Sequence, residues 1–104
     1  MSFVRAAKTT EIAPGQIREI RLEGTTIALA NVAGQFHAIN NTCLHRAGPL
    51  GQGSLQGNVV TCPWHGWSFD VTSGKVEHGQ NVGVACYPVE VRGEDLYVDI
   101  SVPK

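Results

Sequence analysis

The sequence predicts an all-β protein, namely an antiparallel β-sandwich or small barrel that carries an inserted, loop-rich subdomain. Three observations lead to this fold class. Helical periodicity is weak along the whole chain, whereas short runs rich in β-branched residues recur between glycine-containing turns. Between positions 40 and 85 glycines cluster and apolar runs are short. At 104 residues, the chain is expected to form one domain around an apolar core.

The first half of the framework is expected from residues 1–39. Runs rich in β-branched residues at 17–23, 26–32 and 36–39 are separated by the turns EGTT and AGQ. Short strands joined by such glycine-containing turns predict an antiparallel meander.

The second half of the framework is expected from residues 86–104. Apolar and polar residues alternate over 87–92, and again over 96–100 after the turn RGED, which predicts a hairpin of two half-buried strands. Pro88 falls early in the first of these strands, where a missing N–H does little harm. The remaining residues, 40–85, are expected to form the inserted subdomain, because a loop-rich stretch of this length in a compact domain is usually functional.

Composition excludes several classes of function. Eight Lys/Arg against nine Asp/Glu give a net charge of -1, with both signs scattered, so no basic stripe indicates nucleic acid or an anionic membrane surface. The sequence contains no run of about 20 apolar residues, so it predicts no membrane-spanning helix. The N-terminus lacks the long apolar segment of an export signal. We therefore expect a cytoplasmic protein, in which three cysteines indicate metal chemistry rather than a disulfide framework.

Two cysteine and histidine pairs, Cys43 with His45 and Cys62 with His65, are the candidate metal ligands. Their spacing is C-x-H, then 16 residues, then C-x-x-H. Thiolate and imidazole together suit zinc or an iron–sulfur centre. A structural zinc finger usually separates its first ligands by two to four residues and brings its histidines together. In one kind of [2Fe–2S] centre, one iron takes two thiolates and the other takes two imidazoles, which suits the alternating order found here.

The stretches CLHRAGPL and CPWHGWSFD resemble the two cluster-binding loops of Rieske proteins. The resemblance covers the inserted segment closely and the flanking strands in their pattern, and it implies the Rieske fold for the whole chain. It also implies a [2Fe–2S] cluster with Cys43 and Cys62 on the buried iron, and His45 and His65 on the exposed one.

The residues around the ligands indicate a low reduction potential. High-potential Rieske proteins, which oxidise quinols, carry a disulfide between the loops and hydroxyl groups that bond to cluster sulfur. The corresponding positions here are Gly48, Trp64, Trp67 and Phe69, which supply neither. We expect a potential near the bottom of the family range of roughly −150 to +300 mV. The lack of an N-terminal anchor in the sequence agrees, since the quinol-oxidising relatives are held at membranes.

The resemblance implies an electron carrier that is not itself an enzyme. No second His/Asp/Glu constellation follows the predicted loops, as the mononuclear iron of an oxygenase would need. We expect a Rieske ferredoxin that passes single electrons from a flavin-dependent NAD(P)H reductase to a terminal aromatic-ring-hydroxylating oxygenase. A small Rieske subunit of an assimilatory NAD(P)H nitrite reductase is the alternative, and a structural zinc module is the third hypothesis.

Several other residues near the loops have structural interpretations. Trp64, Trp67 and Phe69 are expected to pack the loop against the framework, and Gly66 is expected to let the backbone approach the cluster sulfide closely. Cys86 lies outside both loops and is expected to be a small buried residue. A third loop, EHGQNVGVACYP, has no proline before Pro88, so we expect it to protect the cluster less than in relatives with a proline there.

Overall fold

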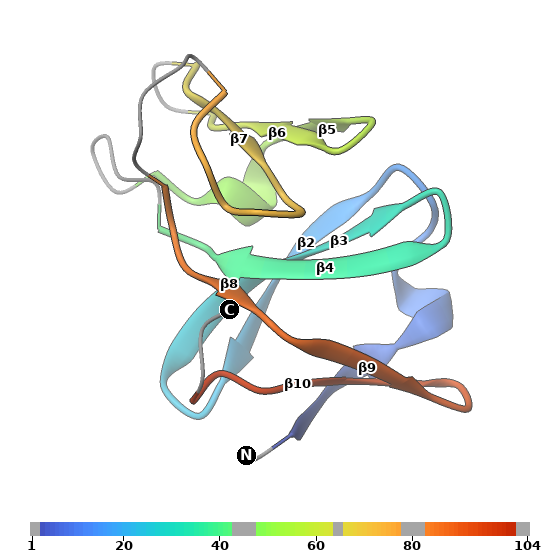
Figure 1. Cartoon of the computed structure of the whole chain (residues 1–104). Coiled ribbons are helices and arrows are strands. Elements are labelled where there is room, and N and C mark those ends of the chain that lie inside the picture. Colours follow the sequence, from blue (N-terminus) through green and yellow to red (C-terminus); the bar gives the residue numbers. More distant parts are fainter. Residues whose placement is uncertain (1–2, 43–47, 64–65, 78–82, 102–104) are drawn as a thin grey trace.

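The computed structural model describes residues 3–42, 48–63, 66–77 and 83–101, and these ranges form antiparallel strands with two short 3-10 turns and no α-helix (Figure 1). The all-β prediction is therefore confirmed. In chain order the elements are β1 (Val4–Lys8), η1 (Thr9–Glu11), β2 (Ile17–Leu22), β3 (Thr25–Val32), β4 (Gln35–Asn40), η2 (Leu50–Gln52), β5 (Ser54–Gln56), β6 (Val59–Thr61), β7 (Ser68–Asp70), β8 (Cys86–Tyr87), β9 (Val89–Arg92) and β10 (Asp95–Val98).

The central sheet has the order β2-β3-β4-β8 and contains the predicted meander. Both of its tight turns place two consecutive residues at positive φ, Glu23 with Gly24 (47° and 88°) and Ala33 with Gly34 (51° and 93°). This backbone conformation matches the twist of two-residue hairpins, and glycine adopts it at little cost. The local turn sequences therefore determine the register of the meander, which pairs Ile17 with Ala30.

The second sheet, β1-β10-β9, contains the predicted closing hairpin. The sequence pattern did not predict β1, which pairs with β10. The prediction of one continuous strand over 87–92 is wrong, because Pro88 separates β8 from β9. β8 pairs with β4 in the central sheet, whereas β9 pairs with β10. A residue without a backbone N–H suits this point, where the chain leaves one sheet for the other.

The third sheet, β5-β6-β7, lies within the segment that was expected to be mostly loops. Its strands have three residues each and pair in register, Leu55 with Val60 and Val60 with Phe69. The described part of the inserted segment thus contains more strand than its glycine content indicated. The division of the chain at positions 40 and 85 stays a prediction.

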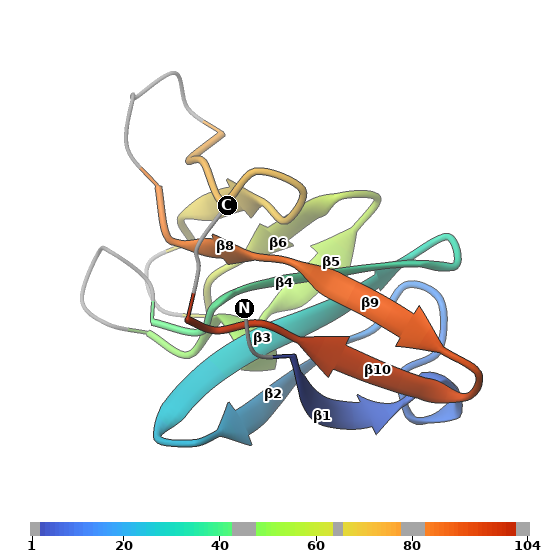
Figure 2. The ribbon, with the colours of Figure 1, turned by 60° about the horizontal axis from the view of Figure 1, so that its bottom comes forward.

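The three sheets form layers with the central sheet in the middle (Figure 1). Alternate residues of β3 enter two different cores, since Ile27 and Leu29 pack toward the β1-β10-β9 sheet while Ala28 and Ala30 pack with residues of β6 and β7. Figure 2 shows β9, β10 and β1 side by side as one outer layer. No helix within the described ranges is long and apolar enough to cross a membrane.

Candidate metal centre

The first predicted cluster loop leaves the end of β4 and returns at η2, and its base is closed by backbone pairing. Thr42 and Pro49 form an antiparallel bridge, and the N–H of Leu50 donates to the carbonyl oxygen of Asn41 at 2.8 Å. The N–H of Thr42 donates to Oδ1 of Asn40 at 2.9 Å. Because the two sides are joined, the loop between them is anchored at both ends.

The second predicted loop joins β6 to β7, and it is closed in the same way. Beyond the last strand pair, the N–H of Cys62 donates to the carbonyl oxygen of Trp67 at 2.7 Å. Between them, Gly66 has φ of 73°, a left-handed conformation that glycine adopts readily. Apart from its chain neighbours, a Cβ at Gly66 would meet no described residue within 4 Å, so the described structure explains this glycine by its backbone conformation. The predicted approach to sulfide stays a prediction.

The third loop begins after β7 and ends before β8, and two glycines close its base. Lys75 pairs with Gly83, and the N–H of Val84 donates to the carbonyl oxygen of Gly74 at 2.8 Å. A Cβ on Gly74 would collide with the carbonyl oxygen of Val84, and one on Gly83 would collide with that of Gly74. The two chain segments approach this closely only because neither residue has a side chain.

The bases of all three loops rest on one apolar core. Leu50 follows the first loop, Cys62 begins the second, and Val76 and Cys86 lie before and after the third, and all four belong to the same buried cluster. Figure 1 shows the described ends of the three loops on the same side of the molecule. The fold therefore brings together three segments that are well separated in the sequence.

Of the four predicted ligands, the described ranges contain Cys62, whereas Cys43, His45 and His65 lie outside them. Cys62 is 2% exposed and packs in the apolar core with Leu50 and Phe69 nearby in the same cluster. A buried thiolate in a water-poor setting fits the inner, cysteine-bound iron of a [2Fe–2S] centre, where the surrounding apolar shell limits access of solvent.

The packing predicted for Trp67 and Phe69 and the burial predicted for Cys86 are confirmed. Phe69 is fully buried, and the partly buried Trp67 packs against the same core. Cys86 is also buried, and its Sγ lies 3.7 Å from the carbonyl oxygen of Thr72. Trp64 lies outside the described residues.

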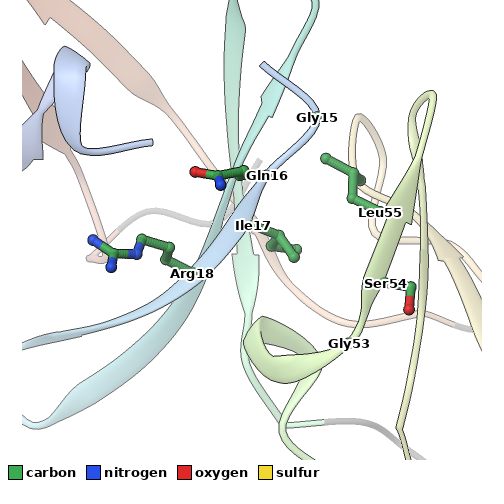
Figure 3. Close-up of a pocket in the computed structure, with 7 residues that line it drawn as sticks. All are labelled: Gly15, Gln16, Ile17, Arg18, Gly53, Ser54 and Leu55. Atoms are coloured by element: carbon green, nitrogen blue, oxygen red, sulfur yellow. The ribbon is translucent and has the colours of Figure 1, made fainter. Parts of the chain in front are cut away.

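A hollow between β2 and β5 is lined by residues 15–18 and 53–55, and none of the predicted ligands is among these described residues (Figure 3). Figure 3 shows Ile17 and Leu55 facing one another across it, while the side chains of Gln16 and Arg18 point to the other side of β2. Ile17 and Leu55 also pack against the core that supports the loops. The hollow therefore lies at the interface between the central sheet and the third sheet.

The charged pairs of the described structure lie on the β1-β10-β9 sheet. Arg5 pairs with Asp95 at 3.1 Å, and Arg92 pairs with Glu90 at 2.7 Å and lies 4.4 Å from the centre of the Tyr97 ring. The hydrogen bond that Arg92 donates to the carboxylate of Glu90 raises the pKa of Arg92 above its ordinary value. These ion pairs belong to the outer layer rather than to the loop bases.

Comparison with known proteins identifies the family. The model of the Rieske [2Fe-2S] domain matches residues 2–88. This chain belongs to the Rieske [2Fe–2S] family. The characteristic cofactor of this family is the [2Fe–2S] cluster, so the hypothesis of a structural zinc module is not supported.

Several relatives of this Rieske chain match it over almost their entire length. The ferredoxin component of a naphthalene 1,2-dioxygenase system from Pseudomonas aeruginosa is 31% identical, over 95% of this chain and 96% of the relative. The biphenyl dioxygenase ferredoxin subunit of Pseudomonas sp. (strain KKS102) is 33% identical, over 97% and 94%. A chain in a solved complex of reduced oxygenase and oxidized ferredoxin in carbazole 1,9a-dioxygenase is 32% identical with a TM-score of 0.85, over 92% and 91%.

The sequence did not reveal the polar residues that secure the first loop of this Rieske chain. Asn40 donates from Nδ2 to the hydroxyl oxygen of Tyr87 at 3.2 Å, and Asn41 contacts both β2 and η2. The run NNT before Cys43 was the available signal, because asparagine often accepts hydrogen bonds from nearby backbone N–H groups. The partners of Asn41 on other elements could be found only in the folded structure.

Proposed function

We propose that this Rieske chain is the ferredoxin component of an aromatic-ring dioxygenase system, a one-electron carrier between a flavin-dependent NAD(P)H reductase and a terminal oxygenase. The observation that carries the proposal is the length of the matches: dioxygenase ferredoxin components align over 96% and 94% of their own sequences. A chain that matches such carriers from end to end is best explained as a carrier of the same size. We further propose that it acts in the cytoplasm.

The proposed ligands are Cys43 and Cys62 for the inner iron, and His45 and His65 for the outer iron. When bound, the [2Fe–2S] cluster accepts and releases one electron. The chain's part is to bind and orient it. The burial of Cys62 supports its assignment to the inner iron, because the apolar residues around it restrict access of water to that side of the site. Gly66, the residue after His65, has a left-handed conformation that glycine adopts readily.

The two histidines are the proposed exit point for the electron, since as ligands of the outer iron they would offer the shortest path out of the cluster. Neutral imidazoles leave that iron easier to reduce than the thiolate-bound one. A carrier must dissociate after each transfer, so we expect a transient interface of less than about 1,200 Å² with each partner.

The test is electron delivery through the complete system. The purified protein is mixed with NADH, a flavoprotein reductase and a terminal oxygenase of the aromatic-ring-hydroxylating class, and the hydroxylated product is measured. Product formation that depends on the carrier supports the proposal. A protein that is reduced by the flavoprotein but supports hydroxylation by no such oxygenase would contradict it.

A small subunit of an assimilatory nitrite reductase was the alternative, and the matched relatives do not favour it. The experiment that separates the two is isolation from the native source. Stable co-purification with a large sirohaem and flavin subunit would favour the nitrite reductase role, whereas a carrier is recovered without one.

A further inference from the structure

One carboxylate, that of Glu19 on β2, holds both sides of the base of the first loop. Its Oε2 accepts from Nδ2 of Asn41 at 2.6 Å, and its Oε1 accepts from Nε2 of Gln52 at 2.7 Å. Asn41 precedes the loop and Gln52 follows it, so the carboxylate links the two sides through a third element. Hydrogen bonds to an ionised acceptor are shorter and stronger than those between neutral groups.

Asn41 extends this link into the backbone of η2. Its Oδ1 accepts from the N–H of Gly51 at 2.6 Å, and its own N–H donates to the carbonyl oxygen of Thr26 on β3 at 3.1 Å. Asn41 is 6% exposed, and a buried amide whose side-chain nitrogen and oxygen are both hydrogen-bonded has one favoured orientation. The residue therefore has a fixed position relative to β2, β3 and η2.

Gly51 shows how closely these elements are packed. A Cβ at this position would lie 2.5 Å from Cγ of Glu19 and 2.7 Å from its backbone nitrogen. Because backbone atoms of β2 cannot move aside as a side chain can, η2 approaches β2 this closely only with glycine at position 51. Direct packing and hydrogen bonds thus hold the loop base at the same place.

We propose that Glu19 is a positioning residue for the first cluster-binding loop and that it acts through Asn41 and Gln52. This inference rests on the proposed ligand set, since Asn41 lies two residues before Cys43. Groups that contact the supports of a metal ligand, rather than the metal, control how accurately that ligand is oriented. Glu19 thereby affects the electronic environment and the retention of the cluster without touching it.

The test exchanges donor and acceptor across the Glu19–Asn41 hydrogen bond. In Glu19→Gln an NH2 group replaces one of the two accepting oxygens, and in Asn41→Asp a second carboxylate faces the first. In the double variant the new NH2 at position 19 donates to the new carboxylate at position 41, while the carbonyl oxygen at position 19 still accepts from Gln52. The double variant has the same net charge as the wild type.

Three readouts are compared at equal cluster loading: the electron paramagnetic resonance spectrum of the reduced protein, the reduction potential, and the rate of cluster loss to a chelator. We expect each single variant to broaden or shift the spectrum and to lose the cluster about tenfold faster, and the double variant to return to within about twofold of the wild type. Glu94→Gln is the matched control, because it removes the same charge at the β9–β10 turn, and it should change none of the readouts.

Gln52→Ala removes one of the two hydrogen bonds to the Glu19 carboxylate. Because position 52 is exposed, this variant should retain the fold, and its rate of cluster loss should lie between those of the wild type and Glu19→Gln. The proposal is overturned if the variants lower only the melting temperature while spectrum and cluster loss stay as in the wild type, or if the double variant rescues neither single variant. A wild-type protein without a [2Fe–2S] spectrum would overturn the ligand set as well. If the protein delivered no electrons to an oxygenase, the proposed function would fail, but the test of Glu19 by cluster spectrum and cluster loss would still be valid.

Discussion

Leu50 is the residue through which the apolar core most directly supports the first loop, and Leu50→Ala is the perturbation that tests this support. Its side chain is fully buried, at 0% exposed, in the cluster that also contains Cys62 and Cys86. Its backbone N–H is bonded to Asn41, on the other side of the loop base. Truncation would leave a cavity beneath the first and second loops together.

The magnitude follows from the burial. Leu→Ala at a fully buried site lowers the free energy of unfolding by about 3 kcal/mol or more. For a domain of this size, each kcal/mol corresponds to a change of roughly 5 °C in melting temperature, so we expect a fall of roughly 15 °C. Leu55 packs against the same core but is only partly buried, so Leu55→Ala is the matched control, with an expected fall of roughly 5 °C.

The assay is a thermal melt followed by far-UV circular dichroism and, in the same sample, by the visible absorbance of the cluster. Both signals should shift together in Leu50→Ala, because fold and loops rest on one core. Equal shifts for the two leucine variants, or a cluster signal that keeps its wild-type midpoint while the fold melts earlier, would refute this reasoning.

Four further variants test individual residues. Cys62→Ala should abolish the visible spectrum of the purified protein. Cys86→Ala, at a similarly buried cysteine outside the ligand set, should keep this spectrum. Loss of the spectrum in both variants would argue against Cys62 as a ligand. Gly66→Ala should lower the free energy of unfolding by about 1 kcal/mol in a denaturant titration, because position 66 has φ of 73°, and no change would show that this backbone conformation costs nothing there. His65→Cys should lower the reduction potential in a spectroelectrochemical titration, since a charged ligand replaces a neutral one, and a rise would contradict the proposed ligation.

The parts of this fold that could be predicted from the sequence are those specified by local patterns. The meander of β2, β3 and β4 follows from alternation and from turn residues such as Gly24 and Gly34, which act within a few positions. The Cys/His spacing could likewise be recognised without knowledge of the fold, because each pair lies within one short loop.

Features that depend on distant partners could not be predicted in this way. β1 has little alternation of its own and is a strand because β10 lies beside it. The break at Pro88 reflects a change of partner sheet, which no local pattern reports. Glu19 could not be singled out from the sequence, because its hydrogen bonds to Asn41 and Gln52 form only when β2 and η2 pack together.

The most direct test of the central proposal, a cluster with two unlike irons, is an electron paramagnetic resonance spectrum of the reduced protein with analysis of iron and acid-labile sulfide. We predict two irons and two sulfides per chain and an average g value below that of all-cysteine ferredoxins, because imidazole ligation changes the field at the reduced iron. A spectrum like that of all-cysteine ferredoxins, or a colourless protein with one zinc per chain, would contradict it.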